Sequence, residues 1–410
     1  MPLFTSELSY SDDYPTIEPS LNLDFANSRA LDSRITFTRA STATYVGRDG
    51  LIKTAGVNEP RFDHDPDTGE SLGLLIEESR TNLIDYSTDF QNQWAGGSAT
   101  NNQTLAPDGT STAAKYAAAA TVSLNKTYTS TSRPNTAVKF NLATGTYDST
   151  IVGTPTDYDI EPYGNGWYRC YFSVSSTTFS VFAKKGELDY IVIQLSNIKA
   201  FIYAWNAAGN QTTTTDGIYI WGAQIEDGSF PTSYIPTSGS TATREKEFPT
   251  IETSSIDFHD FSQGGEGTLL CEFSNAGSTG SDIAVCFSGD THNGATFVGL
   301  GTNSNRNAFN RNRVDATNNV LSVDSNFTTT GFYKVAFGIG QSRCTLAVRG
   351  SSSGVLEDTS VSYDSTPYTK LILGCDQTSS SINNMINGTI KSVFYYPTLL
   401  SDTQLQTLTQ

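Results

Sequence analysis

The sequence predicts an all-β protein in which an N-terminal module precedes two β-sandwich (jelly-roll) domains. Aromatic residues make up 11% of the 410 positions, whereas charged residues account for only 16%. Much of the remainder is Gly, Ser, Thr and Asn, which favour turns over long helices. Short runs of β-branched and aromatic residues recur between these turn residues. Such a rhythm is typical of sandwiches, and the length is sufficient for several domains.

The charge of the chain argues against two classes of partner. The formal net charge is −17, and the N-terminal, middle and C-terminal parts are each net negative. Nucleic acid and anionic membrane surfaces both select for clustered Lys and Arg. No apolar run approaches the roughly 20 residues that span a bilayer, and the first residues do not resemble a signal peptide. We therefore expect no nucleic-acid partner and no membrane insertion.

The five cysteines are widely spaced and include no C-x-x-C pair. This pattern excludes a zinc ribbon and a disulfide-dense scaffold. We expect buried free thiols, although one disulfide among the last four cysteines is left open. The five are Cys170, Cys271, Cys286, Cys344 and Cys375.

Residues 1–82 are expected to form the N-terminal module. Ile35–Thr38 alternates as a strand does, and two hairpins follow at Tyr45–Ile52 and Pro60–Ile76, each with a Gly- and Asp-containing turn. The sequence therefore predicts that this module is β-structure from Ile35 onward.

Three segments of this module resemble, in the same order, a module near the N-terminal side of tailed-phage structural proteins. They are Ile35–Thr44, Val57–Phe62 and Gly73–Leu83. The resemblance implies a virion fibre, spike or decoration protein that attaches to the particle through residues 1–82. It also implies other virion proteins as partners, assembly as a homotrimer in the host cytoplasm, and a final location on the virion tail or head surface.

Residues 83–240 are predicted to form the first sandwich. The strand-like runs are 137–142, 167–174, 179–184, 190–195, 200–205 and 217–221. A carbohydrate-binding-like jelly roll common in phage fibres is similar to the segments Phe140–Thr146, Gly164–Cys170 and Ile218–Pro236. One departure from that family is the hairpin at Ser180–Gly186, which here follows the strand containing Trp167 instead of preceding it.

Residues 248–410 are predicted to form the second sandwich, after a Ser/Thr/Gly-rich and then charged linker at 237–247. Ile386–Tyr396 and the segment after it are similar to the last strand and closing helix of concanavalin-like and laminin-G-like sandwiches. The strand stops at Pro397, and Ser401 is predicted to cap one helical turn.

Asp63, Asp65 and Asp67 alternate before Gly69 and are candidate ligands for Ca²⁺, which prefers carboxylate oxygens. The spacing does not fit an EF-hand. The competing interpretation is a hairpin turn whose shape is set by Asp and Pro. Apart from this calcium ion, we expect no cofactor.

Glycan binding needs aromatic surfaces and planar polar groups, and repeated weak sites then raise the overall affinity. Trp167 and Trp221 lie within strand motifs and are expected in the core. The basic run at 303–313 suits an acidic glycan, but a loop tip or a subunit contact explains it equally well. The candidate binding residues are Trp94, Trp205, Asn206, Arg306, Arg311 and Arg313.

No local pattern indicates catalysis. Gly350–Gly354 matches the G-x-S-x-G string, but no helical pattern follows it, so a turn is predicted. Glu77 and Glu78 point to opposite faces if they lie on a strand, and the family resemblance implies that they and Arg80 form structural ion pairs at a domain junction. We therefore predict a non-enzymatic fibre or spike that binds host-surface polysaccharide. The alternatives are a capsid head fibre or decoration protein, a polysaccharide depolymerase, and a secreted bacterial adhesin.

Overall fold

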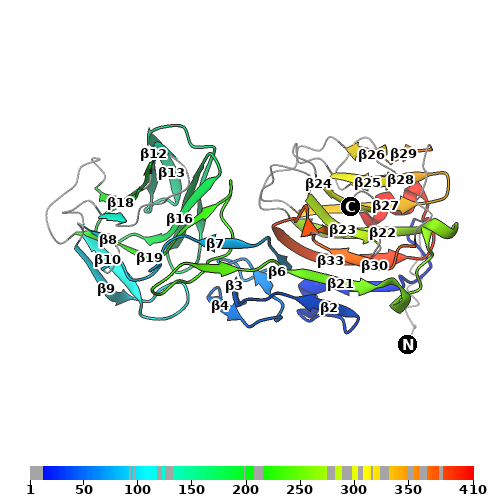
Figure 1. The fold of residues 1–410 in the computed structure, drawn as a ribbon, viewed down its shortest axis with the longest axis horizontal. Helices are drawn as coiled ribbons and strands as arrows, with labels where there is room; N and C mark the ends of the chain where they lie inside the picture. Colours follow the sequence, from blue (N-terminus) through cyan, green and yellow to red (C-terminus); the bar gives the residue numbers. More distant parts are fainter. Residues whose placement is uncertain are drawn as a thin grey trace, which may run out of the picture. The chain divides into compact units, whose positions relative to one another are not determined.

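The computed structural model describes residues 13–91, 94–95, 98–117, 122–124, 133–197, 199–206, 216–274, 282–288, 298–302, 308–314, 317–323, 332–348, 355–359, 367–377 and 382–410. Strands make up almost all of the secondary structure in these residues, which confirms the all-β prediction (Figure 1). The chain divides into two units. The first unit combines Met1–Phe37 with Phe248–Gln410, and the second unit is Thr38–Glu247.

These units differ from the domains expected from the sequence, because residues 1–82 are divided between them. In the first unit, β1 (Leu21–Asp24) pairs antiparallel with β33 (Gly388–Tyr396). Likewise, β2 (Ile35–Thr38) pairs with β21 (Phe248–Glu252). Backbone hydrogen bonds to strands that follow residue 247 thus place β1 and β2 in the first unit.

The second unit is a sandwich of two six-stranded antiparallel sheets. The first sheet has the order β14 (Asp157–Pro162), β15 (Trp167–Val174), β16 (Thr177–Lys184), β19 (Gly217–Asp227), β10 (Ala113–Ala117) and β9 (Ser98–Thr104). The second sheet has the order β13 (Thr146–Val152), β12 (Arg133–Asn141), β17 (Tyr190–Asn197), β18 (Lys199–Trp205), β11 (Val122–Leu124) and β8 (Trp94–Ala95). All six strands predicted in this region are present.

One apolar core lies between these two sheets. Phe172 and Phe179 enter it from the first sheet, while Phe140 and Ile193 enter it from the second, and all four are fully buried. Each such side chain contributes about 1.5–3 kcal/mol when removed from water. Successive residues of a strand point to opposite faces of its sheet, so every second residue of these strands faces this core.

Shorter strands complete the second unit. The two predicted hairpins are confirmed as β3 (Ala43–Val46) with β4 (Ile52–Ala55), and β5 (Phe62–His64) with β6 (Ser71–Ile76). The predicted linker is wrong, because Ala242–Arg244 forms β20, which pairs with β7 (Arg80–Asn82). Arg244 and Glu247 in this segment are buried, whereas the residues of a free linker are exposed to solvent.

The first unit is also a two-sheet sandwich. One sheet contains β1, β33, β22 (Gly267–Ser274), β27 (Phe332–Ile339), β28 (Cys344–Val348) and β29 (Leu356–Asp358). The other has the order β2, β21, β30 (Lys370–Leu373), β23 (Asp282–Ser288), β24 (Val298–Thr302), β25 (Ala308–Val314) and β26 (Thr317–Val323). The rings of Phe287 on β23 and Tyr395 on β33 meet edge-to-face at 5.4 Å, which joins the two sheets.

The closing helix α2 (Asp402–Leu408) packs Leu405 against the outer side of the first sheet of this unit. The Ser401 hydroxyl accepts the N–H of Gln404, and the Gln404 side-chain oxygen accepts the backbone N–H of Ser401, so the predicted cap is confirmed. All five cysteines are free and buried, as expected. None of the helices in the described part of the chain has the length and apolar character needed to cross a membrane.

Candidate functional site: an aromatic sheet face

The sequence-predicted binding residues lie on separate elements of the two units. Trp205 ends β18 and Asn206 follows it; both are half-buried. Trp94 lies on β8 in the second unit, whereas Arg311 and Arg313 lie on β25 in the first unit. The side chains of these three, and all of Arg306, lie outside the described residues, as does the G-x-S-x-G string at 350–354.

Trp205 belongs to an aromatic row on β18. Ala200, Ile202 and Ala204 point into the core and are fully buried. The alternate residues therefore point to the outer face of the second sheet. They are Phe201, Tyr203 and Trp205, each of them half-buried.

The neighbouring strands β17 and β12 extend this row into a broader surface. Tyr190 on β17 is the direct register partner of Trp205. The Lys139 ammonium on β12 lies 4.9 Å from the centroid of the Tyr190 ring and 5.9 Å from that of Trp205. Asp148 on β13 forms an ion pair of 2.8 Å with Lys139 and so fixes the position of the amine. We call Phe201, Tyr203, Trp205, Tyr190 and Lys139 the aromatic face.

The aromatic face is held rigid by ring contacts and hydrogen bonds. The rings of Phe201 and Tyr203 are nearly parallel, with centroids 6.2 Å apart and an interplanar angle of 15°. The Tyr203 hydroxyl donates to Gln194 Oε1 at 2.9 Å, and the Gln194 amide donates to Asn135 Oδ1 at 2.6 Å. Partial burial raises the pKa of Tyr203, so its hydroxyl remains a neutral donor.

Of the aromatic face, only Trp205 was among the binding residues predicted from the sequence. A signal for the others is present, because Ala-Phe-Ile-Tyr-Ala-Trp alternates small or aliphatic residues with aromatic ones. That pattern predicts a strand with one aromatic side. Which side of β18 is covered depends on the first sheet, which packs against the side of Ala200, Ile202 and Ala204, and this packing is not a local property.

The three aspartates proposed as calcium ligands have separate roles. Asp65 Oδ1 accepts the backbone N–H groups of Asp67 and Thr68 at 3.0 and 2.7 Å, so it shapes the turn between β5 and β6. Asp63 Oδ1 accepts the N–H of Val46 at 2.6 Å. Among the described residues, no group of three or more His, Cys, Asp and Glu side chains is placed to hold a metal ion. The geometry thus favours the turn.

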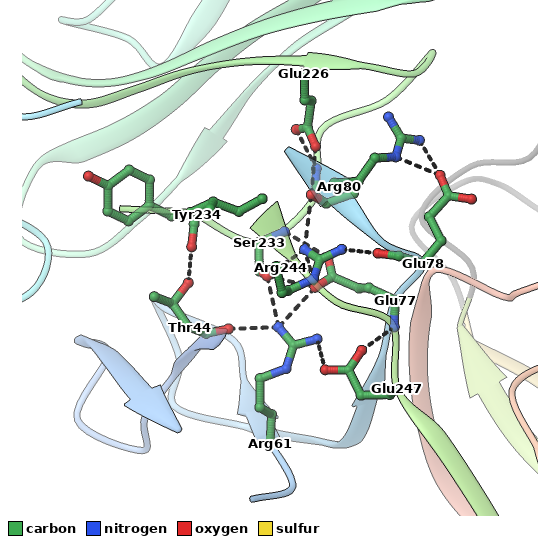
Figure 2. A network of polar contacts seen from close by, with 12 residues as sticks. Thr44, Arg61, Glu77, Glu78, Arg80, Glu226, Ser233, Tyr234, Arg244 and Glu247 are labelled. Carbon is green, nitrogen blue, oxygen red and sulfur yellow. Dashed lines mark hydrogen bonds and ion pairs between the residues drawn. The ribbon is translucent and has the colours of Figure 1, made fainter. Parts of the chain in front are cut away.

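Figure 2 shows a buried charge network in the second unit. Glu77 Oε2 lies 2.9 Å from both Arg61 and Arg244, and Glu247 Oε1 lies 2.6 Å from Arg61 and 3.2 Å from Arg39. Ser233 completes the coordination of Glu77 by donating its N–H and hydroxyl at 2.7 and 2.6 Å. Each carboxylate therefore meets two guanidinium groups, as buried charges require.

Glu78 and Arg80 form a second pair beside this network, as the sequence analysis expected. The Arg80 guanidinium also donates to the backbone oxygen of Asp227. The Arg61 side chain donates to the backbone oxygen of Thr44, whose hydroxyl donates to the backbone oxygen of Tyr234 (Figure 2). These contacts are structural, because the hydrogen bonds of Arg80, Arg61 and Thr44 connect segments of the second unit that lie far apart in the sequence.

No protein-family model and no curated protein matches the chain. Among solved structures, the CBM40 of the Ruminococcus gnavus IT-sialidase bound to α2,3-sialyllactose aligns over 37% of this chain and 91% of its own, at 15% identity and a TM-score of 0.33. Domains LG4-5 of the mouse laminin α1 chain align over 81% of this chain and 94% of their own length, at 12% identity and a TM-score of 0.26. The Trypanosoma rangeli sialidase aligns over 96% of this chain and 97% of its own length, at 9% identity and a TM-score of 0.28. Similarity this low carries no conclusion about what the chain binds.

Proposed function

We propose that this chain is a non-enzymatic glycan-binding protein whose aromatic face receives an extended polysaccharide. The observation that carries the proposal is the outward row of Phe201, Tyr203 and Trp205 beside Tyr190. Flat aromatic rings offer apolar surface for the C–H faces of sugar rings. Such a row accepts consecutive sugars along one strand.

Polar groups beside the rings suit the sugar hydroxyls. The Lys139 amine donates hydrogen bonds, the Asp148 carboxylate accepts them, and the Asn141 amide nitrogen, 3.4 Å from the Tyr190 hydroxyl, is a further donor. Because this site is a shallow face rather than an enclosed cleft, we expect weak affinity per copy. Several copies on one particle raise that affinity through effective concentration.

Affinity electrophoresis of the full chain through gels containing soluble bacterial polysaccharides tests the proposal. We expect Trp205→Ala and Tyr203→Ala each to weaken retention by about tenfold, equivalent to ~1.4 kcal/mol. Tyr158→Ala is the matched control, because Tyr158 is an exposed tyrosine on β14 of the opposite sheet. Retention that survives both substitutions, or no retention in any gel, overturns the aromatic face as the binding site.

We propose the biological role of this protein from the resemblance of segments within Ile35–Leu83 to a module of tailed-phage structural proteins. We assign it to a virion as a homotrimeric fibre or spike that contacts other virion proteins and host-surface polysaccharide. A capsid head fibre or decoration protein is the second candidate. Immunogold labelling of virions distinguishes tail from head, and an absence of label from every particle removes both and favours an adhesin.

Two further measurements address assembly and catalysis. Light scattering of the full chain is expected to give three times the mass of one chain, and a monomer at micromolar concentration contradicts the trimer. Incubation with each retained polysaccharide is expected to release no reducing sugar. Release of reducing ends would replace the binding proposal with a depolymerase.

A further inference from the structure

The strand β14 lies at one end of the first sheet of the second unit, and within the described residues only β15 pairs with it. We call its other, unpaired side the β14 edge. An open edge normally presents unpaired N–H and C=O groups, which allow a strand of another chain to add to the sheet. Whether a strand can add here therefore depends on the groups that β14 directs outward.

The outward N–H groups belong to alternate residues of β14. Tyr163, which follows the strand, donates its N–H to the backbone oxygen of Trp167 on β15 at 2.8 Å, so this N–H points toward β15. In an antiparallel pair the direction reverses at each residue. The N–H groups of Tyr158 and Ile160 therefore point to the β14 edge, whereas Pro162, at the third outward position, has no N–H.

Both outward donors are already used within β14. The Tyr158 N–H donates to Asp157 Oδ1 at 3.0 Å, and the Ile160 N–H donates to Asp159 Oδ1 at 2.8 Å. Each of these exposed aspartates thus bonds the N–H of the residue that follows it. The β14 edge consequently presents backbone acceptors but no backbone donor that is still available.

An apolar patch lies beside this edge. Tyr158, Ile151 and Val152 are 40%, 45% and 39% exposed. The Tyr158 ring lies 4.2 Å from the ring of Tyr147 on β13, whose hydroxyl is hydrogen-bonded to Thr150 Oγ1 at 3.0 Å. The Tyr158 ring is therefore close to the end of β13, where Ile151 and Val152 follow. Exposed apolar surface of this kind favours contact with another protein.

A second copy of this chain matches the β14 edge about a twofold axis. With Asp159 of the two copies opposite each other, Tyr158 of one copy lies opposite Ile160 of the other, and their backbone groups are oriented to exchange hydrogen bonds. This pairing needs the two N–H groups that the aspartates occupy. It also places Asp157 of one copy opposite Glu161 of the other, and like charges in this position are unfavourable.

We propose that Asp157 and Asp159 guard the β14 edge: their hydrogen bonds to the backbone prevent a second copy of the chain from extending the first sheet. Release of the Tyr158 and Ile160 N–H groups converts this edge into a contact between copies. The inference does not depend on glycan binding, because the aromatic face lies on the other sheet of the unit.

Light scattering of the full chain tests the guard, with the mass of each variant compared with that of the wild-type protein. We expect Asp157→Ala/Asp159→Ala to at least double the wild-type mass, because both N–H groups become available beside the apolar patch. The matched control is Asp67→Ala/Glu70→Ala, which removes the same charge from exposed residues between β5 and β6. This control should keep the wild-type mass.

Two further variants identify the cause of the association. Asp157→Asn/Asp159→Asn keeps the side-chain oxygens that accept the two N–H groups, and it should keep the wild-type mass. Adding Tyr158→Pro to the alanine variant removes one outward donor at a position where an edge strand tolerates proline, and it should restore the wild-type mass. Association caused by misfolding would not be reversed in this way.

Three results would each overturn the proposal. The first is an alanine variant that keeps the wild-type mass. The second is an asparagine variant that associates as strongly as the alanine variant, which would assign the guard to charge alone. The third is an association of the alanine variant that Tyr158→Pro leaves unchanged.

Discussion

Arg61 and Glu247 form an ion pair of 2.6 Å in which neither side chain has any exposed surface. Arg61 immediately precedes β5, and Glu247 is the last residue of the second unit. The pair thus connects an early hairpin of this unit to its C-terminal end. Glu247 also receives the backbone N–H of Glu77 at 2.9 Å, so one carboxylate joins three segments.

Glu247→Gln is expected to destabilise the protein strongly. The substitution removes the negative charge that lies against both Arg39 and Arg61 in a site from which water is excluded, and breaking a buried pair in this way costs about 3–5 kcal/mol. Urea unfolding measures the change. Lys53→Met, which breaks the exposed pair with Asp49, is the matched control and should cost less than about 1 kcal/mol. If the two substitutions lower the free energy of unfolding by the same amount, burial of the Glu247 ion pairs does not increase their contribution to stability.

Acid should weaken the second unit through Glu77. Burial alone would raise the pKa of Glu77, but the guanidinium groups of Arg244 and Arg61 outweigh it and hold the pKa at about 2. The folded-state value lies below the ordinary 4.5, so ionised Glu77 stabilises the fold above pH 4.5, and that contribution is lost as pH falls toward 2. Urea unfolding from pH 6 to pH 2.5 checks this, with Glu187→Gln at an exposed pair as the control. Equal free energies of unfolding at pH 5 and pH 2.5 contradict it.

Asp63 should act in the opposite direction and in a higher pH range. Burial raises its pKa to about 7, against an ordinary value of 3.8. The favourable protonated form is fully populated below pH 3.8, and its contribution to stability is lost as pH rises through 7. Asp63→Asn keeps an acceptor for the Val46 N–H and removes the titration. Relative to the wild-type protein, this variant should therefore be more stable at pH 8 than at pH 5, as measured by urea unfolding. A pH-independent difference contradicts the raised pKa.

Ser401→Ala should destabilise the first unit by about 1 kcal/mol. The substitution removes the hydroxyl that accepts the Gln404 N–H at the start of α2, and N-cap removals typically have this size. Thr403→Ala is the control, because Thr403 is exposed within the same helix and its side chain caps nothing. Thermal unfolding compares the two, and equal melting temperatures would show that the capping box contributes nothing to stability.

Patterns of short range made the correct predictions. Runs of β-branched and aromatic residues between turns predicted the strands at 167–174 and 200–205, Gly- and Asp-containing turns predicted the hairpins, and Ser401 after Pro397 predicted the N-cap of α2. Trp167 and Trp221 are buried as expected, with 3% and 2% of their surface exposed. Each of these features depends on neighbours within a few residues, so the sequence contains the information locally.

The errors arose where distant segments meet. Residues 237–247 have the composition of a linker, yet Arg244 and Glu247 find buried partners in Glu77 and Arg61. The aromatic face likewise combines Lys139, Tyr190 and Trp205 from three different strands. No local pattern encodes these meetings, because a buried charge is tolerated only where the fold supplies its counter-charge.

By itself, the sequence determined the all-β class, the positions of several strands, the acidic character and the aromatic content of this protein. Only the tertiary structure decided which side of β18 faces outward and that residues 1–82 divide between two units. The physical reason is that alternation defines two faces of a strand, whereas burial of one face depends on the sheet that packs against it.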